Sequence, residues 1–325
     1  MRPAVPGASA PQTKTWSIII PTLNEEAFIA TCLEAICQLD YDLSTVEVLV
    51  ADNGSSDRTL QIAGTFSHRL DIRILSIPGV SVSALRNSGA RAAQGRYLAF
   101  VDADCDVCPQ WLEAADRILA ANVTVTGASY LVPPNAPWPG RVWYWRFDQR
   151  RTGAVPFVPA GNMLLARDLF WRIGGFDESL RANEDVEFCA RAKRAGATVF
   201  ADEALSIVHH GCERNLAHFV RRQFWHGSAV MNRSALHANR RAISLAIYTL
   251  ACTMLLLVSG IFGRVALVSA CLCALLLPPV LLALSGPERG RKLHYGPLLV
   301  VLVLAYAFAR ALVLPLAAFR GIHRA

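Results

Sequence analysis

The sequence predicts an α/β domain, an open sheet covered by helices, followed by transmembrane helices at the C-terminal end. Strand-like and helix-like segments alternate from Trp16 to about Ala201, which is typical of such a sheet. Polar loops follow three of the strand-like segments, at the sheet edge where α/β proteins bind ligands. The last quarter of the 325-residue chain is far more apolar than the rest, which indicates a membrane environment for that part.

The predicted elements follow one another closely. Strands are expected at 16–20, 46–51, 72–76 and 96–101, where short apolar runs are bounded by turn-forming residues. Helices are expected at 27–39, 57–67 and 83–94, where apolar side chains recur at helical spacing. The first, second and fourth strands end in the polar segments 21–25, 52–57 and 102–104. We expect these loops to form a nucleotide pocket at one edge of the sheet.

Asp102 and Asp104 are the most informative pair of residues, because Ala103 alone separates two carboxylates at the end of a buried strand. Mg²⁺ and Mn²⁺ prefer oxygen ligands and keep part of their water, so a short acidic loop together with a phosphorylated ligand suits them. Alternatively, the aspartates only turn the chain or cap a helix that starts near Pro109. The neighbouring polar loops favour the cation, and with it a nucleoside-diphosphate substrate.

Three apolar stretches are each long enough, at about 20 residues, to cross a bilayer as a helix. They comprise residues 243–262, 265–284 and 297–318. Two residues separate the first two stretches, which predicts a hairpin, and Pro278 and Pro279 are expected to kink the second. Arg310 is a costly charge inside the third, for which a re-entrant course is the alternative to a full crossing. Buried core helices are the other alternative for all three.

Cationic residues flank the predicted spans. They are Arg233, Arg240 and Arg241 before the first span and Arg289, Arg291 and Lys292 after the second. The positive-inside rule places them on the cytoplasmic face, which predicts a multi-pass inner-membrane protein with a cytoplasmic catalytic domain. Arg320 and Arg324 at the tail oppose three full crossings. The net charge of +7 is explained by these arginines and anionic lipid, and without a nucleic-acid-binding module no DNA or RNA partner is expected.

The expected domains are a disordered leader over 1–14, a catalytic domain over 15–235 and a membrane domain over 236–325. The leader is rich in Pro, Ala and Gly and lacks the apolar core of a signal peptide. The nine cysteines show no disulfide framework of a secreted protein. Cys105 and Cys108 form a C-x-x-C pair, but a zinc or redox role is disfavoured because no second such pair accompanies it.

Successive segments of the chain resemble the motifs of family 2 glycosyltransferases with the GT-A fold. On the donor side these are SIIIPTLNEE (17–26), DNGSSDRT (52–59), RN with a following glycine (86–89) and FVDAD (100–104). GNM (161–163), GGFD (174–177) and EDVEF (184–188) resemble the acceptor-side half. Together they cover roughly residues 16–228, and their joint order is specific although each motif alone is weak. The resemblance implies a GT-A nucleotide-sugar-binding domain, a Rossmann-like sheet with helices on both faces.

The resemblance also implies roles for individual residues. The nucleotide-sugar contacts map to Pro21, Thr22, Asn24, Glu25, Asp52, Arg86, Asp102, Ala103, Asp104, Gly161 and Asn162. Asp104 is expected to hold Mg²⁺ or Mn²⁺, Asp102 to contact ribose or the cation, and His209 or His210 to complete the metal shell. Purely structural interpretations remain open for two of these residues. Asp52 would cap the next turn, and Arg86 would be a solvated charge on a helix. A zinc cluster that adds Cys212 and His218 matches no usual structural spacing.

Asp185 is the general base that the resemblance implies, with Glu184 beside it. Attack from the face opposite the leaving group would invert the anomeric carbon. Alternatively, both carboxylates only oppose the dipole of a helix N-terminus. The segment RRQFWH (221–226) departs from the Gln-x-x-Arg-Trp motif of processive relatives, which favours the addition of one sugar at a time.

An aromatic stretch at 138–147 with flanking arginines suits either a membrane interface or the packing of the acceptor lobe. The expected partners are a nucleotide-diphosphate sugar and a membrane-associated acceptor: a lipid, a polyprenyl-linked glycan or a cell-envelope polysaccharide. Two other functions remain open. A nucleotidyltransferase is disfavoured because a Gly-rich phosphate loop with a Lys is missing, and a non-catalytic membrane scaffold because both acidic pairs are present.

Overall fold

A computed structural model describes residues 14–121, 124–147, 152–180, 182–229, 240–284 and 295–322. The chain divides into two compact units. Unit 1 comprises Met1–Leu131 and Arg150–His210, and unit 2 comprises Val132–Gln149 and Gly211–Ala325. Residues 1–13 of the predicted leader, and the side chains of the cationic residues that flank the spans, lie outside the described part. The division of the chain at 235 and 236 stays a prediction.

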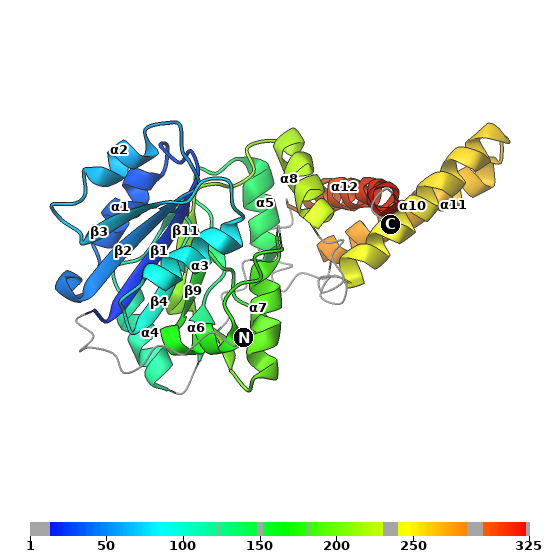
Figure 1. The fold of residues 1–325 in the computed structure, drawn as a ribbon. Coiled ribbons are helices and arrows are strands. Elements are labelled where there is room, and N and C mark those ends of the chain that lie inside the picture. Colours follow the sequence, from blue (N-terminus) through cyan, green and yellow to red (C-terminus); the bar gives the residue numbers. More distant parts are fainter. Residues whose placement is uncertain are drawn as a thin grey trace. The chain divides into compact units, whose positions relative to one another are not determined.

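Unit 1 is built on an eight-stranded sheet of order β3-β2-β1-β4-β9-β6-β10-β8 (Figure 1). Strands β1 to β4 are parallel, whereas β9 runs antiparallel to both β4 and β6. The strands are β1 (Trp16–Thr22), β2 (Val46–Asp52), β3 (Ile72–Ser76), β4 (Tyr97–Val101), β6 (Val125–Gly127), β8 (Gly153–Ala154), β9 (Asn162–Ala166) and β10 (Val199–Ala201). A second sheet joins β5 (Cys105–Asp106), β11 (Ile207–His209) and β7 (Tyr130–Leu131) in the order β5-β11-β7.

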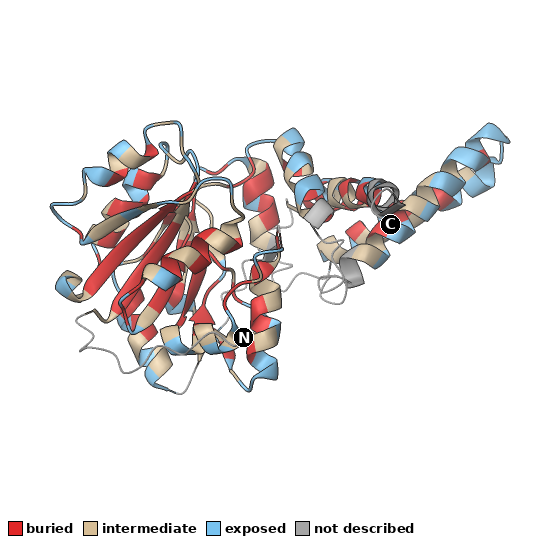
Figure 2. Cartoon of the chain, in the orientation of Figure 1, coloured by how far each residue is buried: buried red, intermediate tan, exposed pale blue. Residues whose placement is uncertain are grey.

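Helices cover both faces of the large sheet, as the sequence predicts. They are α1 (Ile29–Cys37), α2 (Thr59–Gly64), α3 (Val82–Ala92), α4 (Trp111–Ala120), α6 (Arg167–Ile173) and α7 (Glu184–Arg194), with short 3₁₀ turns at Leu43–Thr45 and Glu203–Leu205. Ile18 and Ile20 of β1 pack in a cluster with α1 and α4, whereas Ile19 packs in another with α3, α6 and α7. Alternate side chains of one strand therefore fill two cores. Strands β1 and β2 are buried almost throughout, whereas the edge strand β3 is half-buried to exposed (Figure 2).

The predicted strands agree closely with the structure, but two predicted helices are shorter. The helix expected at 57–67 begins at Thr59, because the Asp57 carboxylate accepts the Thr59 backbone N–H and caps the turn. It ends at Gly64, after which the chain continues in turns with i to i−3 hydrogen bonds. Likewise, the helix expected at 27–39 spans only Ile29–Cys37. Helix α3 agrees with expectation and is capped by Ser81, whose hydroxyl accepts from the Ala84 N–H at 3.2 Å.

Unit 2 contains α5 (Trp138–Phe147), α8 (Leu216–Ala229), α10 (Arg240–Ile261), α11 (Val265–Leu284) and α12 (Gly296–Ile322). Within the described residues, three segments are long and apolar enough to cross a membrane: Ile243–Ile261, Val265–Leu284 and Gly296–Val313. The first two form the predicted hairpin, turned by Gly263 in the left-handed conformation. Helix α11 continues through Pro278 and Pro279. Most side chains of α10 and α11 are exposed or half-buried (Figure 2), as expected for helices that face lipid.

Helix α12 is more enclosed than the hairpin helices, with 39% of its apolar window buried against 17% for each of the others. Val142 and Trp143 of α5 and Phe219 of α8 pack with its residues Leu299 and Leu302. The aromatic stretch, predicted for either the membrane interface or the acceptor lobe, therefore packs against α8 and α12 inside unit 2. Its flanking Arg150 and Arg151 lie outside the described residues.

Candidate active site

The loops that follow β1 and β2 are joined by hydrogen bonds. Asn24, in the left-handed conformation at φ 57°, donates its N–H to the Ser55 hydroxyl and accepts the Ser56 N–H at its side-chain oxygen, both at 2.9 Å. The buried Thr22 donates to Asp52 at 3.2 Å. Asp52 also accepts the backbone N–H groups of Gly54 and Ser55 at 2.9 Å. These contacts hold the loop itself in shape, which is the purely structural role considered for Asp52 above.

Pro21 lies in β1 opposite Ala51 of β2, in the register that brings the two loops to the same edge. Glu25 follows in the first loop, where its N–H donates to the Thr59 hydroxyl at 2.7 Å. Burial and then the charges of Asp104, Asp102 and Asp57 raise the pKa of Glu25 to about 7. Several carboxylates thus face one another at this edge, and such a concentration of negative charge favours a bound cation.

Asp102 and Asp104 leave β4 at this same edge. Ala103 between them is buried. Asp102 accepts a hydrogen bond from the Tyr130 hydroxyl at 3.3 Å. A Cβ at Gly161 would lie 2.1 Å from the Asp102 carboxylate and 2.5 Å from the Tyr130 hydroxyl. Gly161 therefore leaves room for this contact, and any side chain there would displace the acidic loop.

His209 and His210 have different partners. The His209 Nε2 lies 3.3 Å from the Asp104 carboxylate, and the His209 ring stacks on Tyr130 with centroids 4.8 Å apart. The His210 Nε2 instead lies 2.5 Å from Asp106. Of the two predicted histidines, His209 is thus the one beside the acidic loop, while His210 links β5 to the chain that follows β11.

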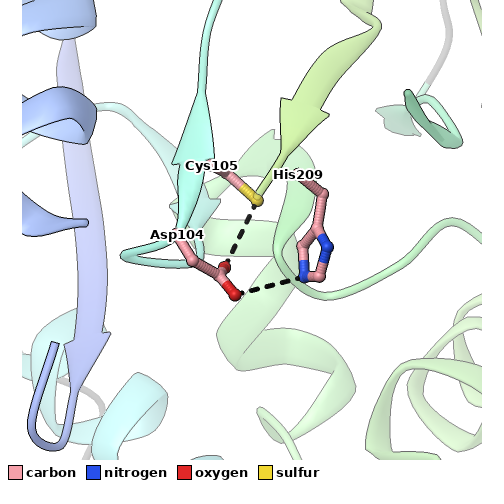
Figure 3. A group of neighbouring side chains, drawn as sticks. All are labelled: Asp104, Cys105 and His209. Carbon is pink, nitrogen blue, oxygen red and sulfur yellow. Dashed lines mark hydrogen bonds and ion pairs between the residues drawn. The ribbon is translucent and has the colours of Figure 1, made fainter. Parts of the chain in front are cut away.

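Asp104, His209 and Cys105 each offer a ligand atom, and these atoms lie within 4.8 Å of one another (Figure 3). The Asp104 carboxylate suits either Mn²⁺ or Mg²⁺, and a phosphorylated substrate would supply further oxygen ligands. The His209 imidazole suits a transition metal such as Mn²⁺ better than Mg²⁺, and the two residues together fit the implied cation. Burial and the nearby Asp102 and Asp104 raise the pKa of the Cys105 thiol well above its usual value. Among described residues, no such group includes Cys108, Cys212 or His218.

Arg86 of α3 is buried and joins two carboxylates from distant parts of the chain. Its Nη2 donates to Asp102 at 2.6 Å and its Nη1 to Glu184 at 2.7 Å. Burial opposes its charge, but Asp102 and Glu184 outweigh burial and raise the pKa of the guanidinium. Arg86 was predicted to face the diphosphate; here its hydrogen bonds go to carboxylates, so it is not a solvated helix charge. It joins the acidic loop to the segment that holds Glu184 and Asp185.

Glu184 and Asp185 open α7, after Asn183 in the left-handed conformation at φ 64°. Asp185 is half-buried and accepts the N–H groups of Val186, at 2.8 Å, and Ala160. Burial and then the Glu184 charge raise the pKa of Asp185 to about 7, against the lowering effects of these N–H groups and of Arg86. Such a pKa suits a general base near neutral pH. The helix N-terminus that the alternative interpretation required is therefore present, but it holds a strongly perturbed carboxylate.

The side-chain amide of Asn162 forms its hydrogen bonds with other parts of the protein. Its amide NH₂ donates to the Ala128 and Leu205 carbonyls, and its oxygen accepts the Trp111 indole N–H. Since the side chain is fully buried, its observed role is to hold β9 against β6 and α4. Its proposed contact with the nucleotide sugar finds no support in these bonds.

Three residues near the site were not assigned to it from the sequence: Tyr130, Cys105 and Asn87. Tyr130 and Cys105 gain their places only through the small second sheet, for which the sequence gives no clear signal. Asn87 lies next to Arg86 in a recognised motif, and its side chain forms paired hydrogen bonds with the backbone of Phe176. Its position in that motif was the signal that could have identified it.

Comparisons with known proteins agree with this architecture. A family model described as glycosyl transferase family 2 matches residues 17–174. Glycosyltransferase AglE of Haloferax volcanii is 31% identical over 253 residues, which cover 72% of this chain and 79% of that protein. Chondroitin synthase of Escherichia coli is 28% identical over 59% of this chain and 34% of its own length. Because these relatives are glycosyltransferases, the nucleotidyltransferase alternative is not supported.

Solved structures share the fold at lower identity. The mannosyltransferase PcManGT from Pyrobaculum calidifontis, in complex with GDP-Man and Mn²⁺, has a TM-score of 0.59 and 19% identity, with 95% of this chain and 90% of that chain covered. TarS 1-349 of S. aureus with UDP-GlcNAc has a TM-score of 0.53 and 18% identity, over 92% and 90% of the two chains. The chain is an enzyme of the GT-A fold and belongs to the family 2 glycosyltransferases.

Proposed function

We propose that this glycosyltransferase is inverting and metal-dependent, and that it moves one sugar at a time from a nucleotide-diphosphate donor to a membrane-associated acceptor. One observation carries the proposal. Arg86 joins Asp102 of the acidic loop to Glu184, the neighbour of Asp185, through two short ion pairs. A cation-binding loop and a base with a pKa of about 7 therefore belong to one connected site.

On the donor side, the loops after β1 and β2 would bind the nucleoside through Thr22, Asn24, Glu25 and Asp52. Asp104 and His209 would hold Mg²⁺ or Mn²⁺, with Asp102 beside them. When bound, the cation would stabilise the negative charge that develops on the diphosphate as the anomeric bond breaks. Two structural neighbours, GalNAc-T7 and PcManGT, are complexes with Mn²⁺, which supports a divalent cation for the present chain without deciding between Mn²⁺ and Mg²⁺.

On the acceptor side, Asp185 would accept the proton of the attacking hydroxyl. The acceptor oxygen forms a bond to the anomeric carbon while the bond to the diphosphate breaks, and that electron pair leaves with the nucleoside diphosphate. A single displacement of this kind inverts the anomeric carbon. Glu184 is bonded to Arg86, so its role would be to position α7 and, through its charge, to keep the pKa of Asp185 high.

The acceptor is proposed to be a lipid, a polyprenyl-linked glycan or a cell-envelope polysaccharide at the membrane surface. Three helices that could span a membrane support this choice. The positive-inside pattern favours the inner membrane with the catalytic unit in the cytoplasm. The relatives include a validoxylamine A glucosyltransferase, and the structural neighbours include complexes with UDP-GlcNAc and GDP-Man, so the donor base and sugar must be found by experiment.

The test uses membranes that contain the full chain, a panel of UDP-, GDP- and dTDP-sugars, and Mn²⁺, Mg²⁺ or EDTA. Release of one nucleoside diphosphate with cation, and its loss in Asp104→Ala, is expected. The matched control is Asp71→Ala, which changes a half-exposed carboxylate at the start of β3 that pairs with Lys14. Nuclear magnetic resonance of the product identifies the anomeric configuration.

Each outcome is informative. Retention of the donor configuration would contradict the single displacement. Equal turnover in EDTA would contradict the metal requirement. If no nucleotide sugar of the panel is turned over even when lipid extracts are supplied, a non-catalytic scaffold of the same fold would be favoured.

A further inference from the structure

Charge is distributed unequally between the two units. Unit 2 contains 15 of the 32 Lys and Arg residues of the chain but only three of its 25 Asp and Glu residues, which gives it a formal net charge of +12. Unit 1, by difference, has a net charge of −5. The unit with the apolar helices is therefore the one that attracts anions.

Arg310 lies inside the apolar window Gly296–Val313 of α12. A charge in such a segment is costly and usually marks a functional site with a partner of opposite charge. A Cβ at Gly227 of α8 would lie 3.1 Å from the Arg310 Cδ, so the two helices approach closely here. The Arg310 guanidinium lies 5.1 Å from the Tyr306 ring centroid, and its Nε is buried with no hydrogen-bond partner among the described residues.

One basic side chain of α8, His226, lies near Arg310, and Arg222 lies near His226, one turn earlier on the same helix. Burial, together with the charges of Arg222 and Arg310, lowers the pKa of His226 to about 4, so its imidazole is neutral near pH 7. Arg222 donates to the Gly211 carbonyl at 2.8 Å and lies 3.7 Å from Glu213.

Glu213 is the one acidic residue in the described part of unit 2, and its ion pair is with Arg222. Within the described residues, no carboxylate forms an ion pair with Arg310. A guanidinium at the contact of two helices, with other basic groups around it, therefore lacks a counter-ion that the chain itself supplies there. An anionic ligand would remove the cost of this arrangement.

We propose that Arg310, His226 and Arg222 bind the phosphate of a polyprenyl-type membrane lipid, which is the acceptor or its carrier; this last identity rests on the proposed function. A phosphate suits the cluster because a guanidinium binds two of its oxygens at once and a neutral imidazole donates one N–H. The lipid chain suits the surroundings, since Phe224 and Trp225 of α8 are exposed at 37% and 51%.

The test measures binding of a long-chain polyprenyl phosphate to the purified full chain in nanodiscs of neutral lipid. Retention of radiolabelled lipid on the immobilised protein gives the affinity, with the uncharged polyprenol as the parallel ligand. Polyprenyl phosphate should bind and polyprenol should not. Arg310→Gln should weaken binding at least about tenfold, the loss expected for a strong charge-assisted pair. Arg264→Gln, at the exposed turn between α10 and α11, is the matched control and should bind as the wild type does.

Two further arms identify the source of the phosphate. Excess inorganic phosphate should not displace the lipid, because it lacks the chain. Phosphatidylglycerol in the nanodisc should compete weakly. Equal competition by phosphatidylglycerol would overturn the assignment to a polyprenyl-type lipid and make the cluster a site for bulk anionic lipid.

Equal binding by Arg310→Gln and the wild type would overturn the site itself. If Arg310→Gln does not elute as a monodisperse protein, Arg310→Lys and His226→Gln take its place, each with an expected loss of about threefold to tenfold. The binding assay needs no donor and no catalysis. Failure of donor hydrolysis by the wild type would therefore contradict the proposed function alone, and failure of lipid binding would contradict this inference alone.

Discussion

The donor-side and acceptor-side halves of unit 1 hold their functional residues in different ways. On the donor side, two adjacent loops bind each other, as in the hydrogen bonds of Asn24 with Ser55 and Ser56, which are 31 and 32 residues away in sequence. On the acceptor side, Glu184 is held by Arg86, 98 residues earlier in the chain. The donor half is thus organised by neighbouring strand ends, and the acceptor half depends on a helix of the donor half.

Helix α3 is the element that the two halves share. Arg86 contacts both Asp102 and Glu184, and Asn87 forms hydrogen bonds with the backbone of Phe176 and the carboxylate of Glu178. Substitutions within one half should therefore affect one step of the reaction. Substitution of Arg86, which contacts both halves, should affect both.

Asp185→Asn is expected to have the largest effect, because it removes the proposed base and leaves the donor loops intact. Transfer should fall by about 10²–10⁴-fold, the usual contribution of general base catalysis. The affinity for the nucleoside diphosphate with Mn²⁺ should stay within about twofold of the wild-type value, because the variant keeps the donor loops intact. Steady-state kinetics and calorimetric titration measure the two quantities. A parallel loss of nucleotide binding would contradict the separation of the halves.

Arg86→Gln should damage both halves at once. The substitution leaves two partly buried carboxylates, Asp102 and Glu184, without the guanidinium that pairs with them. Removal of one partner of a buried pair typically lowers the free energy of unfolding by about 3–5 kcal/mol. Thermal unfolding of the purified protein should shift to a clearly lower temperature, and nucleotide binding and transfer should both weaken.

The matched control for Arg86 is Arg91→Gln, on the same helix. Arg91 pairs with Glu178 at 3.1 Å, but both side chains are about half exposed, at 57% and 44%. Such pairs contribute about 0–1 kcal/mol, so the control should unfold near the wild-type temperature. Equal shifts in the two variants would show that burial does not distinguish these pairs.

Asn87→Ala should have an intermediate effect, confined first to the acceptor half. The variant leaves the Phe176 N–H and carbonyl without their partners, and an unsatisfied buried group costs about 1–3 kcal/mol. The expected result is a lower unfolding temperature with a higher KM for the acceptor and an unchanged KM for the donor. Ser88→Ala, the next position on α3, serves as the control. A rise in the donor KM alone would contradict the prediction.

The sequence predicted the donor half well because its signals are local. Short apolar strands, each followed by a polar loop, indicated an open α/β sheet and placed Asp52, Asp102 and Asp104 at one edge, where the parallel strands β2 and β4 end. The GT-A fold and the transferase family are confirmed by the comparisons. The apolar helices were equally plain, because composition and length alone identify them.

The remaining features could not be predicted because long-range packing decides them. Nothing local shows that Arg86 would pair with Glu184, that Tyr130 would contact Asp102, or that His209 and His210 would take different carboxylates. The Arg86–Glu184 contact joins helices that are 98 residues apart in sequence. The contacts of Tyr130 and His209 depend on the small second sheet, whose strands of two or three residues leave almost no periodicity to recognise.

The dependence on pH gives the smallest and most specific test of the two halves. The pKa values of Asp185 and Glu25 are both raised to about 7, the first by burial and Glu184, the second by burial and the acidic loop. A bound cation would offset the negative charges around Glu25 and so lower the pKa of Glu25. The pKa of Asp185 should change less, because the charged neighbours of Asp185 are Glu184 and Arg86. With saturating Mn²⁺ and donor, kcat should therefore rise through about pH 7, roughly tenfold per pH unit below it, as Asp185 loses its proton.

The free energy of unfolding should fall as pH rises, whereas kcat should increase. Because the folded pKa of Asp185 lies above its usual value of 3.8, the protonated carboxyl stabilises the fold below about pH 4, and this contribution is lost as pH rises through about 7. Asp185→Asn should remove both trends, so that its unfolding temperature falls less between pH 5 and pH 8 than that of the wild type. Glu25→Gln should keep the kcat profile and flatten only the pH dependence of Mn²⁺ affinity. A kcat profile that Glu25→Gln abolishes would move the titrating base to the donor half.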